Sequence, residues 1–370
     1  MDKINVSLSG FGTIGKYHTL AYKCLPLCHE DIGCSINLYK LLTSKSLDKH
    51  ITGFQIHTNN IEDLYDTDML DICSPNFVHK EQIKKAVSMG IKNIYCEKPL
   101  SGISDEEKYL VQLADDNKIT NQVALMMRFY PAVSRTKRLI EDGVIGNVIN
   151  FNCHMYHQSY LDPKRPISWR LRKDKSSGGA LVDLGIHMID LVRYILGDIV
   201  ETRAITSTVI KKRPCKEGYM DVDVDDFAHL DLVLKPGITG TLEVSRMAAG
   251  HGDDIIFQVF GTEGSITVDG KDFEWPVVYL LKDNTWLKGD FKKYFDVEDD
   301  IALLMPPSKF SLGWMMNAHM ASIYSFILKL QGRKLKYITP ACFEDSYQSS
   351  LILKAAYESA ENGGKAVKII

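Results

Sequence analysis

The sequence predicts an α/β chain in two parts: a parallel sheet covered by helices, then an α+β part with a large, mostly antiparallel sheet. In about the first 127 residues, short and continuously apolar segments alternate with helix-like segments. That alternation is typical of a parallel sheet buried on both faces. From about residue 200, β-rich segments follow one another with turn residues between them, which is typical of an antiparallel sheet. We therefore expect two domains, residues 1–128 and 129–370.

The first part shows strands and helices in strict alternation. Strands are expected at residues 4–10, 37–43, 69–74, 93–96 and 122–127. Helices are expected at residues 13–25, at 79–88 and from Ser104 onward, where Glu107 completes a capping box.

The second part changes character after Pro131. A short helix leads into longer strands near residue 148, and a strong helical pattern covers 179–196. Further β-rich segments are expected at 201–210, 226–234, 240–247, 255–261 and 264–270, with helices at 318–331 and 344–361.

Composition narrows the function. The 370 residues are 45% hydrophobic and 25% charged, with a net charge of −3, so nucleic acid and anionic membranes are not expected as partners. No apolar segment is long enough to cross a bilayer, and the first residues lack the pattern of a signal peptide. Eight cysteines are scattered along the chain, which suggests reduced thiols. A cytoplasmic protein is expected.

A glycine motif follows the first strand and opens the first helix. Its residues are Gly10, Phe11, Gly12, Thr13, Ile14 and Gly15. In this position glycines let the turn close and let the backbone approach a pyrophosphate, while the helix N-terminus offers N–H groups to the anion. The motif predicts a dinucleotide site; the alternative is a glycine turn without a ligand.

The end of the second strand bears on the choice of dinucleotide. NAD-binding chains usually place an acid there to bind the ribose hydroxyls. This chain has Thr43, Ser44 and Lys45 instead, and Asp48 comes only later. Hydroxyls and a lysine suit a 2′-phosphate, so NADP is slightly favoured over NAD and both stay open.

Glu97, Lys98 and Pro99 follow directly after a predicted buried strand. Ligands of open α/β sheets bind outside the carboxyl ends of the strands, so this charged pair is expected at the nucleotide site. Pro99 fixes its own φ and restricts Lys98, which would aim the lysine. The alternative is an ion pair on a surface loop.

The helix expected at 179–196 carries two stripes. One is apolar, and the other contains Asp183, His187, Asp190 and Tyr194. Asp183 and His187 are four residues apart and can meet on one helix face. We expect the polar stripe to face a cleft; the alternative is a core histidine satisfied by its own aspartate.

Further candidates lie nearby. Trp169 and Arg170 precede this helix and suit a polyhydroxylated or phosphorylated ligand. Arg128, at the end of the first part, is also taken as a substrate-binding candidate. The segment 153–157, CHMYH, has metal-ligand residue types, but they alternate along a predicted strand, so no metal ligands are assigned.

Five segments together resemble the Gfo/Idh/MocA oxidoreductases, the glucose–fructose oxidoreductase and inositol dehydrogenase group. They are GFGTIGKYH, DICSPNFVHKEQIKKAVSMGIKNIYCEKPL, SSGGALVDLGIHMIDLVRYILG, IIFQVFGTEGSITV and SLILKAAYESAENGG. The chain departs from the family at the missing acid after the second strand, at an apparent insertion over 24–35, and at 290–316, where no motif is found.

The resemblance implies an N-terminal Rossmann dinucleotide-binding domain and a C-terminal α+β domain with a large, mostly antiparallel open sheet. It implies that Lys98 is catalytic and contacts the substrate. In this family the peptide bond between the lysine and the following proline is often cis. It also implies that Asp183 and His187 line the same pocket, and that Ser74, Pro75, Asn76 and His79 lie along the cofactor. In such enzymes the open sheet often joins subunits, so we expect a dimer or tetramer that pairs an apolar sheet face.

These observations predict an NAD(P)-dependent dehydrogenase that acts on a secondary alcohol or ketone of a sugar, sugar phosphate or cyclitol. His187 is favoured as the base, oriented by Asp183, while Lys98 stabilises the alkoxide and Glu97 contacts the cofactor end of the site. The reverse assignment, with Lys98 as the base, stays open. Two alternatives remain: a non-catalytic NADPH-binding sensor or regulator, and a reductase of a non-sugar carbonyl or imine.

Overall fold

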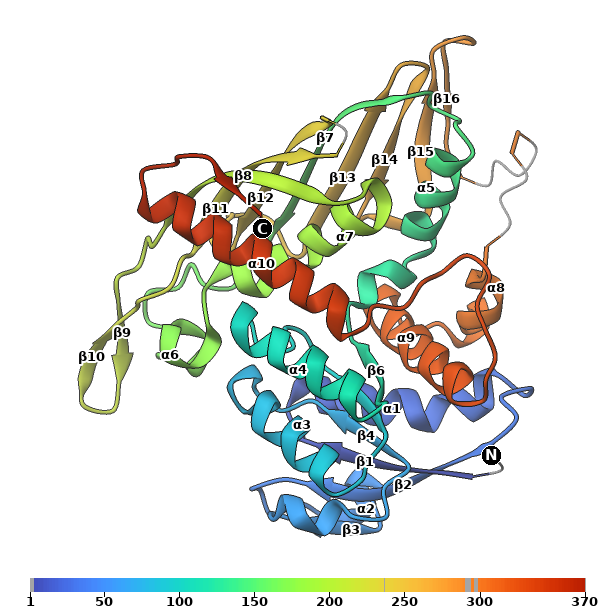
Figure 1. Cartoon of the computed structure of the whole chain (residues 1–370), viewed down its shortest axis with the longest axis vertical. Helices are drawn as coiled ribbons and strands as arrows, with labels where there is room; N and C mark the ends of the chain where they lie inside the picture. The colour runs from blue at the N-terminus through green and yellow to red at the C-terminus, as the bar shows by residue number, and fades with distance from the viewer. Residues whose placement is uncertain (1–2, 236, 290–293, 296–298, 370) are drawn as a thin grey trace. The chain divides into compact units, whose positions relative to one another are not determined.

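The chain divides into two compact units in the computed structural model, which describes residues 3–235, 237–289, 294–295 and 299–369 (Figure 1). The first unit comprises Met1–Ser101, Asp105–Phe129 and Asp300–Tyr347; the second comprises Gly102–Ser104, Tyr130–Asp299 and Gln348–Ile370. This division differs from the expected domains, because 300–347 packs with the N-terminal unit. Its helix α9 (Trp314–Leu330) is almost wholly buried there, and Ser322 of this helix hydrogen-bonds to Tyr95 and Gln122.

Six parallel strands form the sheet of the first unit, counted over the described residues, in the order β3-β2-β1-β4-β5-β6. The strands are β1 (Lys3–Ser9), β2 (Ser35–Leu42), β3 (Ile56–Thr58), β4 (Met69–Ile72), β5 (Asn93–Cys96) and β6 (Thr120–Val123). This confirms the predicted parallel sheet. Strand order reverses between β1 and β4, and the carboxyl ends at such a reversal form the usual ligand site of open α/β sheets.

Helices connect these strands. The α-helices of the first unit are α1 (Thr13–Cys28), α2 (Lys49–Thr52), α3 (His79–Ser88), α4 (Ser104–Asp116), α8 (Ile301–Leu304) and α9. Short 3₁₀ turns are η1 (Ile61–Leu64), η2 (Asn76–Val78), η3 (Met126–Phe129) and η6 (Ser308–Phe310). The α3 helix and the start of α4 lie where the sequence predicted them.

The strand expected at 122–127 is wrong beyond Val123. The N–H of Val123 binds the carbonyl of Ala341, the N–H of Ala124 binds that of Cys96, and the chain then turns into η3. All of this segment is buried, and a buried apolar run does not distinguish a strand from a helical turn.

A nine-stranded sheet dominates the second unit within the described residues. Its order is β16-β15-β14-β13-β7-β12-β11-β8-β17, and only the β7–β12 pair is parallel. The strands are β7 (Val148–Tyr156), β8 (Ile199–Ser207), β11 (Phe227–Leu234), β12 (Thr239–Ser245), β13 (Asp254–Gly261), β14 (Gly264–Asp269), β15 (Asp272–Leu280), β16 (Thr285–Leu287) and β17 (Val367–Lys368). A separate hairpin joins β9 (Lys212–Cys215) to β10 (Gly218–Asp221). The predicted antiparallel sheet is therefore confirmed.

Helices α5 (Pro131–Glu141) and α7 (Ile186–Leu196) pack against this sheet. The second unit also contains α6 (Lys173–Ser176), the 3₁₀ turn η4 (Trp169–Leu171) and most of α10 (Phe343–Glu361). The helix predicted at 179–196 is present, but it opens with a π-helical turn, η5 (Leu181–Gly185). Asp183 lies in this π turn and His187 follows it. A helical wheel of 3.6 residues per turn therefore does not give the angle between their side chains around the helix axis.

The sheet has one buried set of alternate residues and one half-exposed set. The half-exposed set on the central strands is mixed: the polar and aromatic residues Asn152, His154, Tyr156, His229, Glu243, Asp254 and Gln258 lie beside the apolar residues Phe227, Val233, Ile256 and Phe260. Glu243 accepts hydrogen bonds from Tyr156 and His229, and the rings of His154 and Tyr156 stack 4.2 Å apart. The expected apolar sheet face is therefore present only in part.

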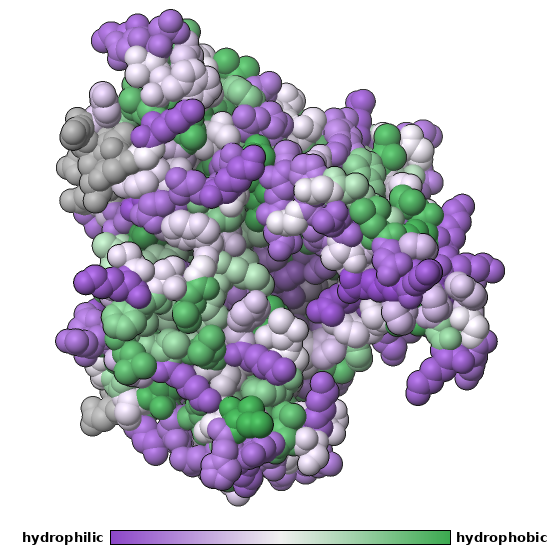
Figure 2. Space-filling model, turned by 180° about the vertical axis from the view of Figure 1, so that it is seen from behind, coloured by the Kyte–Doolittle hydropathy of each residue, from purple (hydrophilic) through white to green (hydrophobic). Residues whose placement is uncertain are grey.

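Hydrophilic side chains cover much of the face shown in Figure 2, with apolar side chains in patches between them. Among the described residues, no helix is both long enough and apolar enough to span a membrane.

Arg128 joins two distant segments of the first unit. Its guanidinium donates to the carbonyl of Thr339 (3.0 Å) and to Asp345 Oδ1 (3.0 Å), and its side chain is only 2% exposed. Burial alone would raise the pKa of Asp345, but Arg128 and the N–H of Cys342 lower that pKa below its ordinary value of 3.8. The expected role of Arg128 in substrate binding stays a prediction, while these contacts favour a structural role.

Replacing Asp345 by Asn should therefore destabilise the protein. Arg128 would stay buried without its counter-charge, at a cost of about 2 kcal/mol, between the values typical of exposed and of buried pairs. Because the pKa of Asp345 is depressed in the folded state, its contribution is present above the unfolded pKa and is lost as the pH falls through the folded pKa. Urea unfolding should show a constant difference between wild type and variant near neutral pH and a shrinking one below about pH 4. A difference that does not change with pH would contradict this account.

Candidate active site

Two of the three glycines in the turn between β1 and α1 are required by close approach of the backbone. Gly10 has φ +91°, and a Cβ there would lie 2.7 Å from the backbone N of Ser74. A Cβ on Gly15 would lie 2.2 Å from the carbonyl oxygen of Gly10, whereas one on Gly12 would meet nothing within 4 Å. Two glycines thus close the turn, and the third leaves open space beside the N-terminus of α1. No side chain caps α1 and its first turn holds no acid, so the turn fits a pyrophosphate.

The loop after β2 is open to solvent. Thr43 is half-buried and accepts a hydrogen bond from the N–H of Lys45 (3.2 Å), while Ser44 and Lys45 are exposed. Asp48 caps α2 by accepting from the N–H of His50 (2.8 Å). The nearest acid is thus already used as a helix cap, and hydroxyls and a lysine remain at the strand end.

The residues expected along the cofactor lie in the loops after β4 and β5. Ser74 donates to Gln82 (2.7 Å), Asn76 donates to the carbonyl of Ser101 (2.9 Å), and Pro75 precedes η2. His79 is 1% exposed and contacts the carbonyls of Ser74 (2.8 Å) and Pro99 (3.2 Å). Burial lowers the pKa of His79, and its two ring nitrogens lie against carbonyls of both loops. Contact with a cofactor stays a prediction for all four residues.

Glu97, Lys98 and Pro99 emerge at the carboxyl end of β5, as expected. The Lys98–Pro99 peptide bond is cis, which confirms the bend that the family resemblance implied. Lys98 is half-buried, and its backbone N–H donates to Glu97 Oε2 (3.2 Å). Glu97 thus holds the backbone of Lys98, while its other oxygen points inward.

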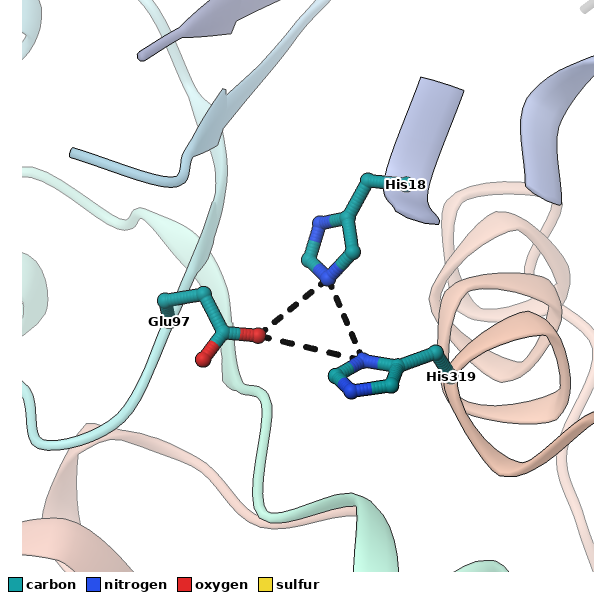
Figure 3. A group of neighbouring side chains, drawn as sticks. All are labelled: His18, Glu97 and His319. Carbon is teal, nitrogen blue, oxygen red and sulfur yellow. Dashed lines mark hydrogen bonds and ion pairs between the residues drawn. The ribbon is translucent and has the colours of Figure 1, made fainter. Parts of the chain in front are cut away.

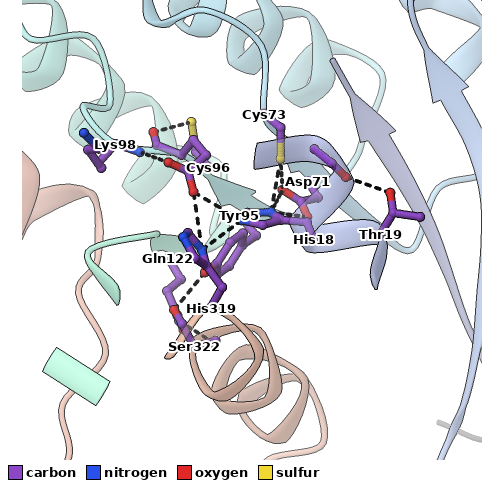
Figure 4. Close-up of polar contacts among 12 residues, drawn as sticks. His18, Thr19, Asp71, Cys73, Tyr95, Cys96, Lys98, Gln122, His319 and Ser322 are labelled. Atoms are coloured by element: carbon purple, nitrogen blue, oxygen red, sulfur yellow. Dashed lines mark hydrogen bonds and ion pairs between the residues drawn. The ribbon is translucent and has the colours of Figure 1, made fainter. Parts of the chain in front are cut away.

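That inward oxygen belongs to a buried polar network that the sequence analysis missed (Figure 4). His18 of α1 lies between two carboxylates: Nδ1 is 2.9 Å from Asp71 Oδ2, and Nε2 is 3.2 Å from Glu97 Oε1. Tyr22 donates to the same Asp71 oxygen (2.8 Å), and Cys73 Sγ lies 3.1 Å from His18 Nδ1. The network ties α1 to the ends of β4 and β5.

Charge explains how the network is held together. Burial alone would lower the pKa of His18, but Asp71 and Glu97 raise it to about 10. Burial alone would raise the pKa of Glu97, but His18 lowers it to about 2. His319 of α9 has its pKa lowered to about 4 by burial. At neutral pH a His18 cation therefore faces two carboxylates and one neutral imidazole.

In the second unit, Asp183 is bound by an arginine that the sequence analysis did not select. Arg246 Nη2 donates to Asp183 Oδ2 (2.9 Å), and the arginine side chain is only 1% exposed while that of Asp183 is 30% exposed. Burial alone would lower the pKa of Arg246, but Asp183 raises it, so the guanidinium stays charged. Arg246 thereby fixes one carboxylate oxygen of Asp183.

Two further predicted residues lie near this pair. The Arg170 guanidinium stacks on the Trp169 ring at 4.4 Å, and the carbonyl of Arg170 accepts a long hydrogen bond from Arg246 (3.5 Å). Arg246 therefore brings Trp169, Arg170 and Asp183 together. His187 is buried on α7, as are Asp190 and Tyr194, so the polar stripe is mostly enclosed by protein.

Asp225 fixes the start of the helix that carries Asp183 and His187. Its carboxylate accepts from the N–H groups of Gly179 (2.9 Å) and Leu181 (2.8 Å) and from the hydroxyl of Tyr357 (2.6 Å). A Cβ on Gly179 would lie 1.9 Å from the carbonyl of Asp225, so only glycine fits there. An acid at a helix N-terminus also suits the helix dipole.

The missed residues had weak signals in the sequence. Asp71 is a charged residue in an otherwise apolar strand, and all four residues of that strand are buried. A buried charge in that position needs a partner. His18 and His319 lie on helices 301 residues apart, so no local pattern relates them. Arg246 follows directly after β12, and its partner is 63 positions away.

The comparisons agree with this architecture. A family model described as "Oxidoreductase family, NAD-binding Rossmann fold" matches residues 4–125, and one described as "GFO/IDH/MocA C-terminal domain" matches residues 133–267. The levoglucosan dehydrogenase of Pseudarthrobacter phenanthrenivorans is 33% identical over 288 residues, which cover 72% of this chain and 73% of that protein. The scyllo-inositol 2-dehydrogenase (NAD(+)) of Bacillus subtilis is 33% identical over 202 residues, 54% of this chain and 55% of that protein.

A solved structure of a dehydrogenase is similar to this chain over its whole length. Levoglucosan dehydrogenase in complex with NADH and L-sorbose superposes with a TM-score of 0.90 at 28% identity, covering 100% of both chains. Together with the two family models and the glycine turn, these matches establish the family. The chain belongs to the Gfo/Idh/MocA family of NAD-binding oxidoreductases.

Proposed function

We propose that the protein is an NAD(P)-dependent dehydrogenase that oxidises a secondary alcohol of a sugar, sugar phosphate or cyclitol, or reduces the matching ketone. The glycine turn carries this proposal, because two of its glycines are required by close backbone approach and the third leaves room for a pyrophosphate. The similarity to dehydrogenases of levoglucosan and scyllo-inositol supports a sugar or cyclitol as substrate. The bound nicotinamide would exchange a hydride with the carbinol carbon.

The chain's own residues would handle the hydroxyl proton. We assign His187 as the base, with Lys98 stabilising the alkoxide oxygen; the reverse assignment predicts the same losses on mutation. Arg246 would hold Asp183 in place, and Trp169 and Arg170 would contact a polyhydroxylated ligand.

Lys98→Ala and His187→Ala should each lower kcat by roughly 10²-fold or more, the usual effect of losing a proton-transfer group. The double variant should lose less than the product of the single losses, as expected for groups that act as a unit. Asp183→Asn should lower kcat while the protein stays folded. Turnover with a panel of polyols, followed by nicotinamide absorbance per folded site, measures all four variants.

Lys84→Ala and His50→Ala are matched controls, because the Lys84 side chain is 39% exposed in an ion pair with Glu81, His50 is exposed, and both lie outside the proposed site. If His187 is only a core histidine, His187→Ala should lower the melting temperature but keep the rate per folded molecule. Full activity in folded Lys98→Ala and His187→Ala would show that the chemistry lies elsewhere. The absence of turnover by wild type with any carbonyl or alcohol would favour a sensor or regulator.

For the cofactor, we propose that NADPH binds more tightly than NADH. The support is the exposed Lys45 beside Thr43 and Ser44, and the use of Asp48 as a helix cap. Lys45→Asp should reverse the order of the two affinities, whereas Lys49→Asp, on α2, serves as a charge-matched control. Equal affinities in wild type that Lys45→Asp leaves unchanged would rule out this loop as the selector.

We further propose a homo-oligomer, a dimer or tetramer, that pairs the half-exposed sheet face of the second unit, which mixes polar, aromatic and apolar residues. The half-exposed residues around Glu243 and Tyr156 support it, since tyrosine is enriched at protein interfaces. Light scattering at micromolar concentration should give a multiple of 41.8 kDa, and Tyr156→Asp should shift it toward the monomer. Lys84→Glu, an exposed charge reversal in the first unit, should leave the assembly intact. A wild-type monomer would contradict the proposal.

A cytoplasmic location is also proposed. All eight cysteines carry free thiols, which is typical of proteins kept in a reducing compartment.

A further inference from the structure

Three donor atoms of the first unit converge on one point inside the buried network. They are His18 Nε2 from α1, Glu97 Oε1 from the end of β5 and His319 Nδ1 from α9 (Figure 3). The three atoms are separated by 3.2 Å (His18 to Glu97), 3.2 Å (His18 to His319) and 3.8 Å (His319 to Glu97). All three residues are buried.

These separations fit a tetrahedral metal ion. A circle through three points with these separations has a radius of about 2.0 Å, so an ion at the usual Zn–N and Zn–O distance of about 2.1 Å from each atom would lie slightly out of their plane. In a regular tetrahedron with bonds of that length, the ion also lies about 0.7 Å from the plane of three ligands. Two imidazoles and one carboxylate are a common three-ligand set, with the fourth position left to water.

The surroundings of His18 match those of a metal-bound histidine. Its other ring nitrogen, Nδ1, lies 2.9 Å from Asp71 Oδ2 and 3.1 Å from Asp71 Oδ1. Metal-binding histidines usually donate this second N–H to a carboxylate, which fixes the tautomer and directs the lone pair of the first nitrogen at the metal. Tyr22 donates to the same carboxylate and holds it in place.

The charges of the buried network also favour a divalent ion. Asp71 and Glu97 are 0% and 6% exposed, so the network holds two buried carboxylates. Inside the network a single protonated His18 neutralises only one of them, and Lys98, the other cation that acts on Glu97, is only half-buried. A divalent ion bound to two neutral imidazoles would neutralise both, and buried charges are costly unless they are paired or bind metal.

We propose that His18, Glu97 and His319 form a binding site for a divalent transition-metal ion of the Zn²⁺ type, with Asp71 as the outer carboxylate. This revises our sequence analysis, which assigned no metal ligands. The ion would replace the proton on His18 Nε2 and crosslink α1, the end of β5 and α9. The proposal is independent of the dehydrogenase activity, since it needs neither cofactor nor substrate.

Co²⁺ titration of tag-free protein, stripped with a chelator, tests the site directly. We expect one Co²⁺ per chain with the visible spectrum of four-coordinate cobalt, displacement of that spectrum by Zn²⁺, and a higher melting temperature with Zn²⁺. His319→Gln should weaken Co²⁺ binding by about 100-fold or more, since even outer ligands of metal sites contribute 10- to 100-fold.

A second ligand variant and a control variant complete the test. Glu97→Gln keeps the shape of its side chain and should also weaken binding, so the test stands if His319→Gln fails to fold. His29→Gln is the matched control, because His29 is a buried imidazole of the same unit that packs against the tilted ring of Tyr324, with centroids 4.3 Å apart, outside the triad. The absence of stoichiometric Co²⁺ binding by folded wild type, or equal binding by wild type, His319→Gln and Glu97→Gln, would overturn the proposal.

Discussion

Two buried carboxylates at the carboxyl end of the parallel sheet impose the main constraint on the first unit. Asp71 lies in β4, one residue before its end, and Glu97 follows β5; both need a positive partner because burial of an unpaired charge is expensive. His18 supplies that partner from α1, the same helix whose N-terminus follows the glycine turn. The pairing therefore fixes the position of α1 along the sheet, and with it the position of the turn that would hold the dinucleotide.

The same pairing connects chemistry to architecture. Glu97 uses one oxygen for His18 and the other for the backbone N–H of Lys98. The lysine proposed to contact substrate is thus anchored through its backbone to the buried network, while its side chain stays half-exposed. In the second unit Arg246 acts similarly on Asp183, which remains 30% exposed while the arginine is buried. In both units a buried charge positions a more accessible group, as required for a preorganised site.

Local patterns in the sequence predicted much of this molecule. The glycine spacing, the apolar strands expected at 69–74 and 93–96 and the helix expected at 79–88 each depend on neighbours within a few positions. The structure has the strands at Met69–Ile72 and Asn93–Cys96 and the helix at His79–Ser88. What could not be predicted depends on distant partners or on backbone irregularity. The His18–His319 contact spans 301 residues, the return of 300–347 to the first unit has no local signature, and the π turn at Leu181–Gly185 changes a helical register that the residue spacing takes as regular. The outer sheet face is more polar than expected, because alternation shows which residues share a face, not what that face contacts.

Because residues 300–347 pack with the N-terminal residues of the first unit, the order of synthesis affects how this unit folds. A chain leaving the ribosome exposes its N-terminal sheet first, and N-terminal domains generally fold first during synthesis. Here α9, which buries its side chains in the first unit, is synthesised only after about 170 residues of the other unit, Tyr130–Asp299. At a synthesis rate of about 5–20 residues per second, the nascent sheet waits on the order of ten seconds or more with that surface uncovered. The first unit is therefore the earlier to start folding and the later to finish, and it is the part for which a nascent-chain chaperone would matter most.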